Sequence, residues 1–363
     1  MYVTEIFVAD YRNLKSQTVA PRQGLNVFMG DNAQGKTNLV ESVCLCCLGK
    51  SPRTGRDADL IAWGKKQAFV RVKYVCRYGE GEISIRLAEG MRKQISVNSV
   101  PVAKTGDLMG YLNCVYFSPD EIKIISQSPS ERRRFMDMDL CQTDKNYFYS
   151  LVRHNKALAQ RNNLLKKCAS FEEAKQQLFM WDGIIAAEGA KIVVRRKEFC
   201  ARLKPLAQKA HSKLTLEEDL QIDYVTAIEG NSVKEAEACY LELLQKNAEK
   251  DFRLRHTTVG CQRDDVAFSV NGTDVRQFGS QGQLRTTALS LKLAELALFR
   301  KIKGEYPVLI LDDVLSELDA DRQKRLLNFD DRLQILLTTA TPVNKKEGAT
   351  FFSVAGGTVS VQK

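Results

Sequence analysis

The spacing of apolar residues changes twice along the chain, and each change marks a different kind of structure. Apolar and polar positions alternate between residues 70 and 102, which is typical of antiparallel strands with one buried face. From 146 to 167 and from 171 to 203, apolar residues instead recur every three to four positions among Gln, Lys and Arg. We therefore expect β hairpins first and then an antiparallel pair of helices.

The last third of the chain returns to strands, but of another type. Residues 307–311 form an apolar run without alternation, and residues 333–337 form another that only Gln334 interrupts. Such runs predict strands that are buried on both faces of a parallel sheet. A helix is expected to begin near residue 281, and residues 351–361 predict a hairpin that turns at Gly356-Gly357.

Together these patterns predict an α/β fold, with a parallel core sheet, an antiparallel β subdomain and a helical second lobe. A chain of 363 residues is longer than one hydrophobic core usually grows. We expect residues 1–118 and 251–363 to form the two halves of one head, with residues 119–250 inserted as the helical lobe. The pattern leaves open whether residues 214–250 belong to that lobe or return to the sheet.

One motif carries a specific chemistry. Residues 30–37 have the pattern G-x-x-x-x-G-K-T, between an apolar strand and a helical pattern, which is typical of a phosphate-binding loop. Its glycines let successive N–H groups converge on an anion at the positive end of the helix dipole. Lys36 is expected on the β and γ phosphates of a nucleotide, and the Thr37 hydroxyl on Mg²⁺. The predicted nucleotide-binding residues are Gly30, Asp31, Asn32, Ala33, Gln34, Gly35, Lys36 and Thr37.

Two further clusters fit the same ligand. Asp312 and Asp313 end a buried strand, where ligands bind in open α/β sheets. We expect Asp312 to hold Mg²⁺ together with Thr37, and Asp313 to polarise the attacking water, so that Asp313, Lys36 and Asp312 are the catalytic candidates. Asp313 reaches one methylene less far than a glutamate, which predicts slow hydrolysis. Ser280, Gly282 and Gln283, at the start of a helix, form a second element able to meet a γ-phosphate.

Charge is concentrated in the predicted helical lobe. The chain has a net charge of +10, and residues 130–213 hold 18 Lys and Arg against 9 Asp and Glu. A basic face of this kind suits a polyanion, although a solvated helical surface is the alternative. The first residues lack a basic leader and no run approaches 18 apolar residues, so a cytoplasmic protein is expected. The ten cysteines form no paired C-x-x-C pattern, which argues against zinc and against a disulfide framework.

The order of these motifs resembles that of an ABC-type ATPase head of the SMC kind, and more narrowly the RecF family of bacterial recombination mediators. The wider resemblance rests on the phosphate loop, the Ser280–Gln283 segment, the Leu309–Asp313 strand and the Ser-Glu-Leu-Asp segment at 316–319. The residues that carry the narrower resemblance are Tyr11-Arg12-Asn13-Leu14, Pro129 to Asp137, Arg263-Asp264-Asp265 and Phe278 to Arg285.

The resemblance implies a composite site in a homodimer that forms on ATP binding. The phosphate loop and Asp312-Asp313 of one subunit would hold Mg-ATP while Ser280 to Gln283 of another closes over the γ-phosphate. Such a dimer would clamp duplex DNA at junctions with single strands, hydrolyse ATP slowly, work with RecO and RecR, and help load RecA in DNA repair, replication and the SOS response. Arg53 lies in a context similar to the SMC arginine loop, where it either reaches the phosphates or faces solvent.

Some features depart from this family. RecF proteins usually have Gly-Pro-His at the position where this chain has Gly260-Cys261-Gln262. ABC ATPases often carry a histidine after the last core strand, whereas this chain offers only hydroxyls at Thr338 to Thr341. No glutamine is assigned to a Q-loop. Two alternatives remain: an ATP-gated scaffold with incidental hydrolysis, or an ABC ATPase subunit coupled to a membrane transporter.

The remaining aromatic and titratable residues are expected to be structural. Trp63 and Trp181 are interpreted as core anchors rather than base-stacking platforms. The histidines, at positions 154, 211 and 256, are interpreted as surface groups.

Overall fold

The computed structural model describes residues 1–215, 217–327, 330–341 and 348–362, and these divide into two compact units. Unit 1 combines Met1–Ile122 with the chain from Ala288 onward, and unit 2 is Lys123–Thr287. The second boundary therefore lies at 287/288, whereas the sequence suggested 250/251. The reason is that β10, after residue 251, pairs along its whole length with β9, so both strands stay with the helices of unit 2.

The core of unit 1 is a six-stranded sheet in the order β15-β14-β3-β13-β12-β8. Neighbouring strands from β14 to β8 are parallel, and only the β14–β15 hairpin is antiparallel. Every residue of β12 and β13 is buried, which confirms the interpretation of the two apolar runs. The strands are β3 (Leu25–Met29), β8 (Cys114–Phe117), β12 (Val308–Asp312), β13 (Ile335–Thr339), β14 (Thr350–Ala355) and β15 (Thr358–Val361).

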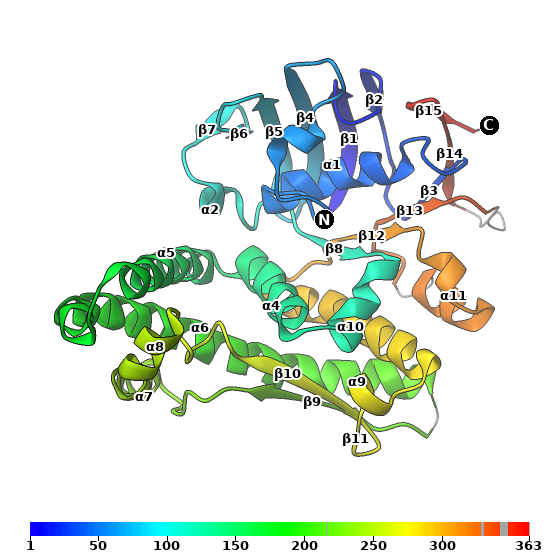
Figure 1. Cartoon of the computed structure of the whole chain (residues 1–363). Coiled ribbons are helices and arrows are strands. Elements are labelled where there is room, and N and C mark those ends of the chain that lie inside the picture. The colour runs from blue at the N-terminus through cyan, green and yellow to red at the C-terminus, as the bar shows by residue number, and fades with distance from the viewer. Residues whose placement is uncertain (216, 328–329, 342–347, 363) are drawn as a thin grey trace. The chain divides into compact units, whose positions relative to one another are not determined.

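The second sheet of unit 1 is antiparallel, in the order β2-β1-β4-β5-β6-β7, as the alternating pattern predicted. Helix α1 (Lys36–Leu48) follows the phosphate loop and packs against strands of both sheets (Figure 1). Because both of its sides meet a sheet, it is buried along almost its whole length. The strands are β1 (Tyr2–Ala9), β2 (Gln17–Val19), β4 (Gln67–Cys76), β5 (Gly79–Ala88), β6 (Gln94–Val97) and β7 (Val100–Val102).

Short helices connect these strands, and one long helix runs from unit 2 into unit 1. That helix is α10 (Gln281–Lys303), whose first residues belong to unit 2 and whose remainder belongs to unit 1. The short elements of unit 1 are η1 (Asp57–Leu60), α2 (Thr105–Leu108), η2 (Pro119–Ile122), η3 (Leu315–Glu317) and α11 (Ala320–Leu327).

Unit 2 is built around an antiparallel pair of long helices, as predicted, with a small sheet packed against it (Figure 1). The second helix is longer than predicted, because it continues through Pro205 to Leu214. Gly189 also lies within it, where a Cβ would collide with the Tyr240 ring, so the glycine allows the close approach of another helix. The elements are α3 (Lys123–Ser126), α4 (Pro129–Thr143), α5 (Lys145–Lys167), α6 (Phe171–Leu214), β9 (Leu220–Val225), α7 (Val233–Lys246), α8 (Ala248–Leu254), β10 (Asp265–Val270), β11 (Thr273–Asp274) and α9 (Val275–Phe278).

Three arginines of the basic segment 130–213 lie inside unit 2. Arg132 pairs with Asp265, Arg196 with Asp137, and Arg161 with Asp182 and Asp251. Each guanidinium is buried, so its charge is balanced by a carboxylate inside the lobe and does not reach the surface. Part of the excess of Lys and Arg in this segment therefore forms buried ion pairs and not a basic surface.

The interpretation of the histidines is wrong at two of three positions, since only His256 is exposed. His154 is buried with Nε2 3.2 Å from the Tyr240 hydroxyl and 3.3 Å from the Cys261 sulfur. Burial lowers the pKa of His154 to about 4. His211 is also buried, beside Glu218, and burial lowers its pKa as well. Both are neutral packing groups at neutral pH.

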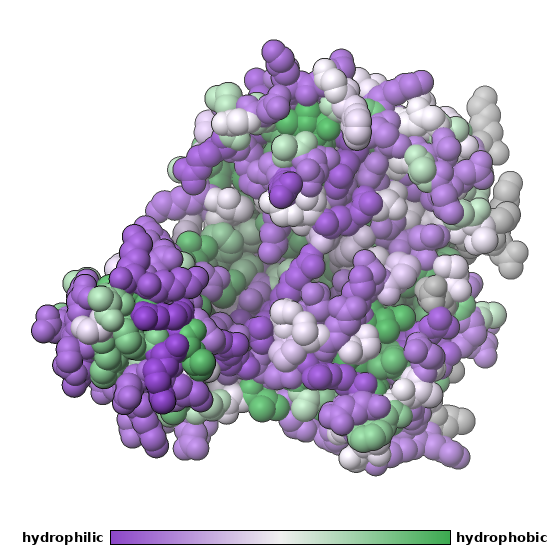
Figure 2. Space-filling model, viewed as in Figure 1, coloured by the Kyte–Doolittle hydropathy of each residue, from purple (hydrophilic) through white to green (hydrophobic). Residues whose placement is uncertain are grey.

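The surface of the face in Figure 2 is mostly hydrophilic, with smaller apolar patches between the polar residues. Within the described parts of the chain, no helix is long and apolar enough to cross a membrane. The same residues contain no group of three or more His, Cys, Asp or Glu side chains arranged to hold a metal ion.

Candidate functional site

The conformation of the phosphate loop explains its glycines. Gly35 precedes α1 with φ +113°, and a Cβ there would lie 2.7 Å from Leu14 Cδ2. Gly30 runs so close to β14 that a Cβ would collide with the carbonyl oxygen of Val354. Ala33 also has a positive φ, of 64°. Both glycines are therefore required by their surroundings, and the loop is held in a strained conformation of the kind found at ligand sites.

Two distant segments brace this loop. The Asn13 side chain donates to the carbonyl of Ala33 at 2.9 Å. From the β14–β15 turn, the N–H of Gly356 donates to Gln34 Oε1 at 2.6 Å and that of Gly357 to the Gln34 carbonyl at 3.1 Å. The loop is thus fixed both by the segment after β1 and by the C-terminal hairpin.

The predicted catalytic and metal-binding residues of unit 1 lie beside the loop. Lys36 Nζ donates to the carbonyls of Gly30 and Asp31, at 2.6 and 2.8 Å. The Thr37 hydroxyl donates to Asp312 Oδ1 at 2.7 Å, across 275 positions of sequence. An adjacent hydroxyl and carboxylate are oxygen ligands of the kind that Mg²⁺ prefers, so this pair fits the predicted ion.

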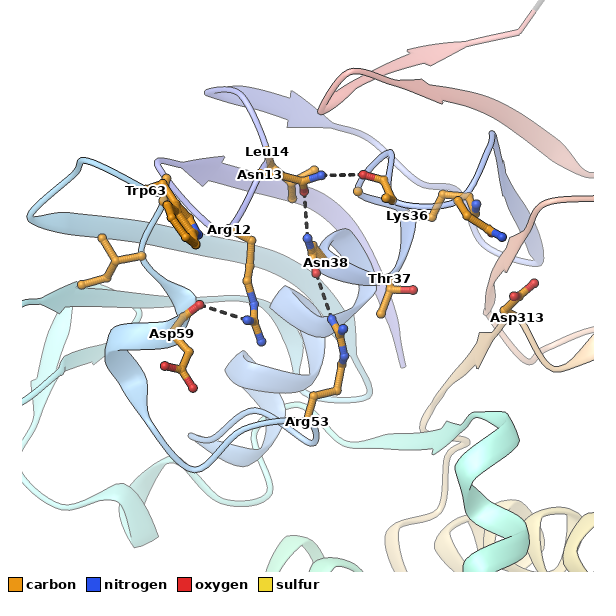
Figure 3. Close-up of a pocket in the computed structure, with 15 residues that line it drawn as sticks. Arg12, Asn13, Leu14, Lys36, Thr37, Asn38, Arg53, Asp59, Trp63 and Asp313 are labelled. Atoms are coloured by element: carbon orange, nitrogen blue, oxygen red, sulfur yellow. Dashed lines mark hydrogen bonds between the residues drawn. The ribbon is translucent and has the colours of Figure 1, made fainter.

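Asp313 has an unusual backbone. Its φ is +53°, and its N–H lies 3.1 Å from the Thr338 carbonyl and 3.0 Å from the Thr338 hydroxyl. A non-glycine residue in this region costs about 1–3 kcal/mol and persists only where the surroundings enforce it. The turn directs the Asp313 carboxylate into the cavity beside Lys36 and Thr37 (Figure 3).

Two arginines share one buried carboxylate next to α1. Arg12 donates to Glu41 through Nε and Nη2, at 3.0 and 2.7 Å, and Glu41 is fully buried. Arg53 Nη1 lies 3.5 Å from Glu41 and donates to Asn38 Oδ1 at 2.9 Å. Burial alone would lower the pKa of Arg12, but the hydrogen bond and charge of Glu41 outweigh it and raise that pKa. The Arg12 guanidinium therefore stays charged at the cavity wall.

Arg12, Arg53, Asp313 and part of the phosphate loop line one cavity of about 760 Å³ (Figure 3). Trp63 and Asp59 lie on the opposite side of it from Lys36 and Asp313. The interpretation of Trp63 as a core anchor is wrong, because its side chain is 100% exposed. The lining residues are Arg12, Asn13, Leu14, Asn32, Ala33, Gly35, Lys36, Thr37, Asn38, Arg53, Asp59, Ile61, Ala62, Trp63 and Asp313.

The Ser280–Gln283 segment belongs to unit 2. The N–H of Gln283 donates to Ser280 Oγ at 3.2 Å, and the N–H of Ser280 to Gln283 Oε1 at 3.0 Å, so the two residues cap the start of α10 reciprocally. Ser280 and Gly282 are exposed. A Cβ on Gly282 would meet only Ser280 Oγ, at 3.7 Å, so the described residues do not require glycine there.

Several residues at the site were not singled out from the sequence. Glu41 stands in the helix after the loop, Tyr116 in β8, and Thr338 in a segment considered only for a missing histidine. A polar residue inside an otherwise apolar element is the available sign, since a buried polar group needs a partner. The partner itself depends on strand order, which the sequence pattern does not give.

The chain is similar to known proteins over nearly its whole length. Residues 2–359 match the family model described as the RecF/RecN/SMC N terminal domain. The chain is 39% identical to the DNA replication and repair protein RecF of Clostridium novyi, over 99% of this chain and 100% of that protein. It is 42% identical to the protein of the same name from Alkaliphilus oremlandii, over 93% of each.

Solved structures give the same result. Those of the recombination mediator protein RecF in the RecFOR pathway, in the ATPrS and ATP forms, align over 100% of this chain and 98% of that chain. Their TM-scores are 0.93 and 0.92, and both are 34% identical to it. An Smc head domain from Pyrococcus furiosus, 17% identical over 99% of this chain and 96% of that one, has a TM-score of 0.57 and shares the fold. The chain belongs to the RecF/RecN/SMC family and, within it, to the RecF proteins.

Proposed function

We propose that this protein is an ATP-dependent, DNA-binding recombination mediator that dimerises on ATP. The observation that carries the proposal is the cavity that holds Lys36, Thr37, Arg53 and Asp313 together at the start of α1. Its elements are those of a Walker-type nucleotide site, and solved relatives carry ATP.

ATP would place its phosphates in the loop 30–37. Lys36 now bonds to two backbone carbonyls, which are weaker partners for an ammonium than a triphosphate is. Thr37 and Asp312 would hold Mg²⁺, whose charge would offset that of the phosphates. Arg53 can leave Asn38 for a phosphate without exposing a buried charge, since Arg12 continues to neutralise Glu41. Trp63, across the cavity, offers a flat face to the base.

Hydrolysis would use Asp313 as the residue that orients the attacking water. The strained turn fixes its carboxylate at the cavity, which favours this role over the capping of a helix. Its short side chain predicts a slow ATPase, which a second subunit and DNA would stimulate.

A second copy of the chain would complete the site. Ser280 and Gly282 are exposed at the N-terminus of α10, where N–H groups and the helix dipole favour a phosphate. The open space beside Gly282 suits the close approach of a ligand from outside the subunit. We therefore assign Ser280, Gly282 and Gln283 to the γ-phosphate of the ATP that a partner subunit holds.

DNA would bind through its phosphates to the exposed basic residues of unit 2. Although three arginines are buried, α5 and α6 still carry many exposed basic side chains. Contacts of this type do not depend on sequence and weaken with salt. The exposed basic residues of the two helices include Lys156, Lys166, Lys167, Lys175, Arg202, Lys209 and Lys213.

The biological role proposed here follows the relatives. Solved relatives are mediators of the RecFOR pathway, so RecO and RecR are the proposed partners, and RecA loading at single-strand gaps is the proposed outcome. The first alternative is a scaffold that ATP gates and whose hydrolysis is incidental. The second alternative is an ABC ATPase subunit of a membrane transporter, whose function would not require a basic lobe.

Fluorescence anisotropy of labelled duplex DNA tests the proposal. The protein is titrated with and without Mg-ATP at two salt concentrations, beside Lys36→Ala, which removes the phosphate-binding ammonium. We expect ATP to tighten binding by the wild type and not by the variant, and salt to weaken it steeply. Binding that is indifferent to ATP would favour the scaffold, and no binding in any condition would contradict a DNA-binding mediator.

A further inference from the structure

Asp312 is held by three hydroxyl groups, one from each of three segments. Thr37 and Thr338 both donate to Oδ1, each at 2.7 Å. Tyr116 donates to Oδ2 at 2.8 Å and is the one of the three that uses this second oxygen. The bonds from Thr338 and Tyr116 are buried, so these two do not compete with bulk water.

The register of the parallel sheet produces this arrangement. Thr338 of β13 lies opposite Asp312, and on the other side of β12, Tyr116 of β8 lies opposite Ile310 (Figure 1). Because side chains two positions apart in a strand share a face, Tyr116 points to the same face of the sheet as Asp312. A tyrosine side chain is long enough for its hydroxyl to reach Asp312, which lies two positions further along the sheet. Ser118 in turn forms a hydrogen bond with the Tyr116 hydroxyl.

We propose that Tyr116 is a positioning residue for the magnesium site. Its hydroxyl fixes the plane of the Asp312 carboxylate, so that Oδ1 stays beside the Thr37 hydroxyl where the ion would be held. This inference rests on the proposed Mg-ATP site and deepens it.

A carboxylate held at one oxygen can still rotate about its Cβ–Cγ bond. Two donors on Oδ1 leave Oδ2 free to turn, and a third donor on Oδ2 removes that freedom. Mg²⁺ demands near-ideal octahedral geometry, so its affinity depends on how well the oxygens are oriented beforehand. Groups that orient metal ligands typically change metal affinity or activity by about 10–100-fold when they are removed.

Tyr116→Phe is the test, because it removes the hydroxyl and keeps the ring. Binding of a fluorescent ATP analogue is measured as Mg²⁺ is increased, then in EDTA without the ion, and thermal unfolding is followed without nucleotide. We expect the Mg²⁺ concentration for half-saturation to rise about tenfold. The affinity for the analogue in EDTA should stay within twofold of the wild type, since the phosphate loop itself is unchanged.

Tyr306→Phe is a matched control. Tyr306 is another buried tyrosine of unit 1 whose hydroxyl donates to an aspartate, Asp330, at 3.0 Å, and neither residue lines the cavity. Its variant should keep the wild-type Mg²⁺ dependence even if its melting temperature falls. Ser118→Ala provides a second route if Tyr116→Phe folds poorly, and it should raise the half-saturation less, in the same direction.

The outcomes separate the inference from the proposed function. A wild-type Mg²⁺ dependence in both Tyr116→Phe and Ser118→Ala would overturn the role of Tyr116 and leave the Mg-ATP site intact. Equal losses in Tyr116→Phe with and without the ion would mean that the tyrosine only supports the fold, which also overturns it. Wild-type protein that binds the analogue regardless of Mg²⁺ would contradict both the inference and the proposed site.

Discussion

Trp63 is the aromatic residue in the wall of the cavity, and its side chain is fully exposed. An exposed indole in a nucleotide-sized cavity is suited to stack on a base, which is worth about 1–3 kcal/mol. We expect Trp63→Ala to weaken ATP binding about tenfold and Trp63→Phe to weaken it less. Inorganic triphosphate, which has no base, should bind the variants and the wild type equally in calorimetric titrations.

The control for this prediction is the chain's second tryptophan. Trp181 lies in unit 2, so Trp181→Phe should leave both affinities unchanged. If Trp63→Ala weakened triphosphate as much as ATP, the indole would support the loop and not the base.

His154 predicts a pH dependence of stability. Burial lowers its pKa to about 4, from about 6.5 in the unfolded chain. Between these values the unfolded chain binds more protons, so the free energy of unfolding falls as pH falls from 6.5 to 4, by up to about 3 kcal/mol. His154→Asn should flatten that dependence in urea titrations at pH 4.5 and 7, followed by Trp181 emission in a Trp63→Phe background.

Two other buried groups of unit 2 act in the opposite direction. Burial raises the pKa values of Asp182 and Asp264, which therefore favour the folded state as pH falls. The difference between His154→Asn and its parent isolates the histidine from them. An identical pH slope in the two proteins would contradict the assignment of His154 as a neutral buried group.

Among the elements, the C-terminal hairpin has the clearest influence on the site. Gly357, with φ +74°, lies against the backbone of Asn13, and a Cβ there would collide with the Asn13 carbonyl oxygen. Because the same residue donates to Gln34, we expect Gly357→Ala to move the hairpin away from the phosphate loop. ATP binding should weaken about tenfold or more, a loss of at least about 1.4 kcal/mol, as measured by equilibrium titration.

Gly356→Ala is the comparison for this element. Gly356 also has a positive φ, of 54°, but a Cβ there has no atom within 4 Å. That variant has only the cost of a left-handed alanine, roughly 1–2 kcal/mol of stability, and should bind ATP normally. Equal ATP affinities in the two variants would show that the hairpin does not brace the loop.

Some helices and strands could be predicted from the sequence, and others could not. The apolar runs before Asp312 and at 333–337, and the spacing of the phosphate loop, follow from local physics and were predictable. The continuation of α6 through Pro205 was not, because packing against other elements overrides a local helix breaker. Trp63 was misassigned for a related reason: tryptophan is usually buried, and a residue type alone cannot reveal a cavity.

For the whole molecule, the main prediction concerns dimerisation. Ser280→Arg places a long cation on the exposed start of α10, where we propose that a partner's ATP docks. The variant should bind ATP as a monomer and fail to dimerise, as judged by light scattering in Mg-ATP.

Two controls accompany it. Ser280→Ala removes the cap without the bulk, at about 1 kcal/mol, and should weaken dimerisation less. Ser212→Arg adds the same side chain at another exposed serine of unit 2 and should dimerise normally. A stable dimer of Ser280→Arg in ATP would contradict the composite site.

The strand order of the core sheet has a consequence for the order of events on the ribosome. The phosphate loop follows β3, and both sheet neighbours of β3, the strands β13 and β14, come from the far end of the chain. At about 5–20 residues per second, the roughly 300 residues between β3 and β13 take about 15–60 s to synthesise. Unit 2, whose residues are contiguous, emerges complete during that interval. A nascent or prematurely terminated chain would carry the loop sequence without the loop conformation, so only a chain that already includes β13 and β14 could compete for nucleotide.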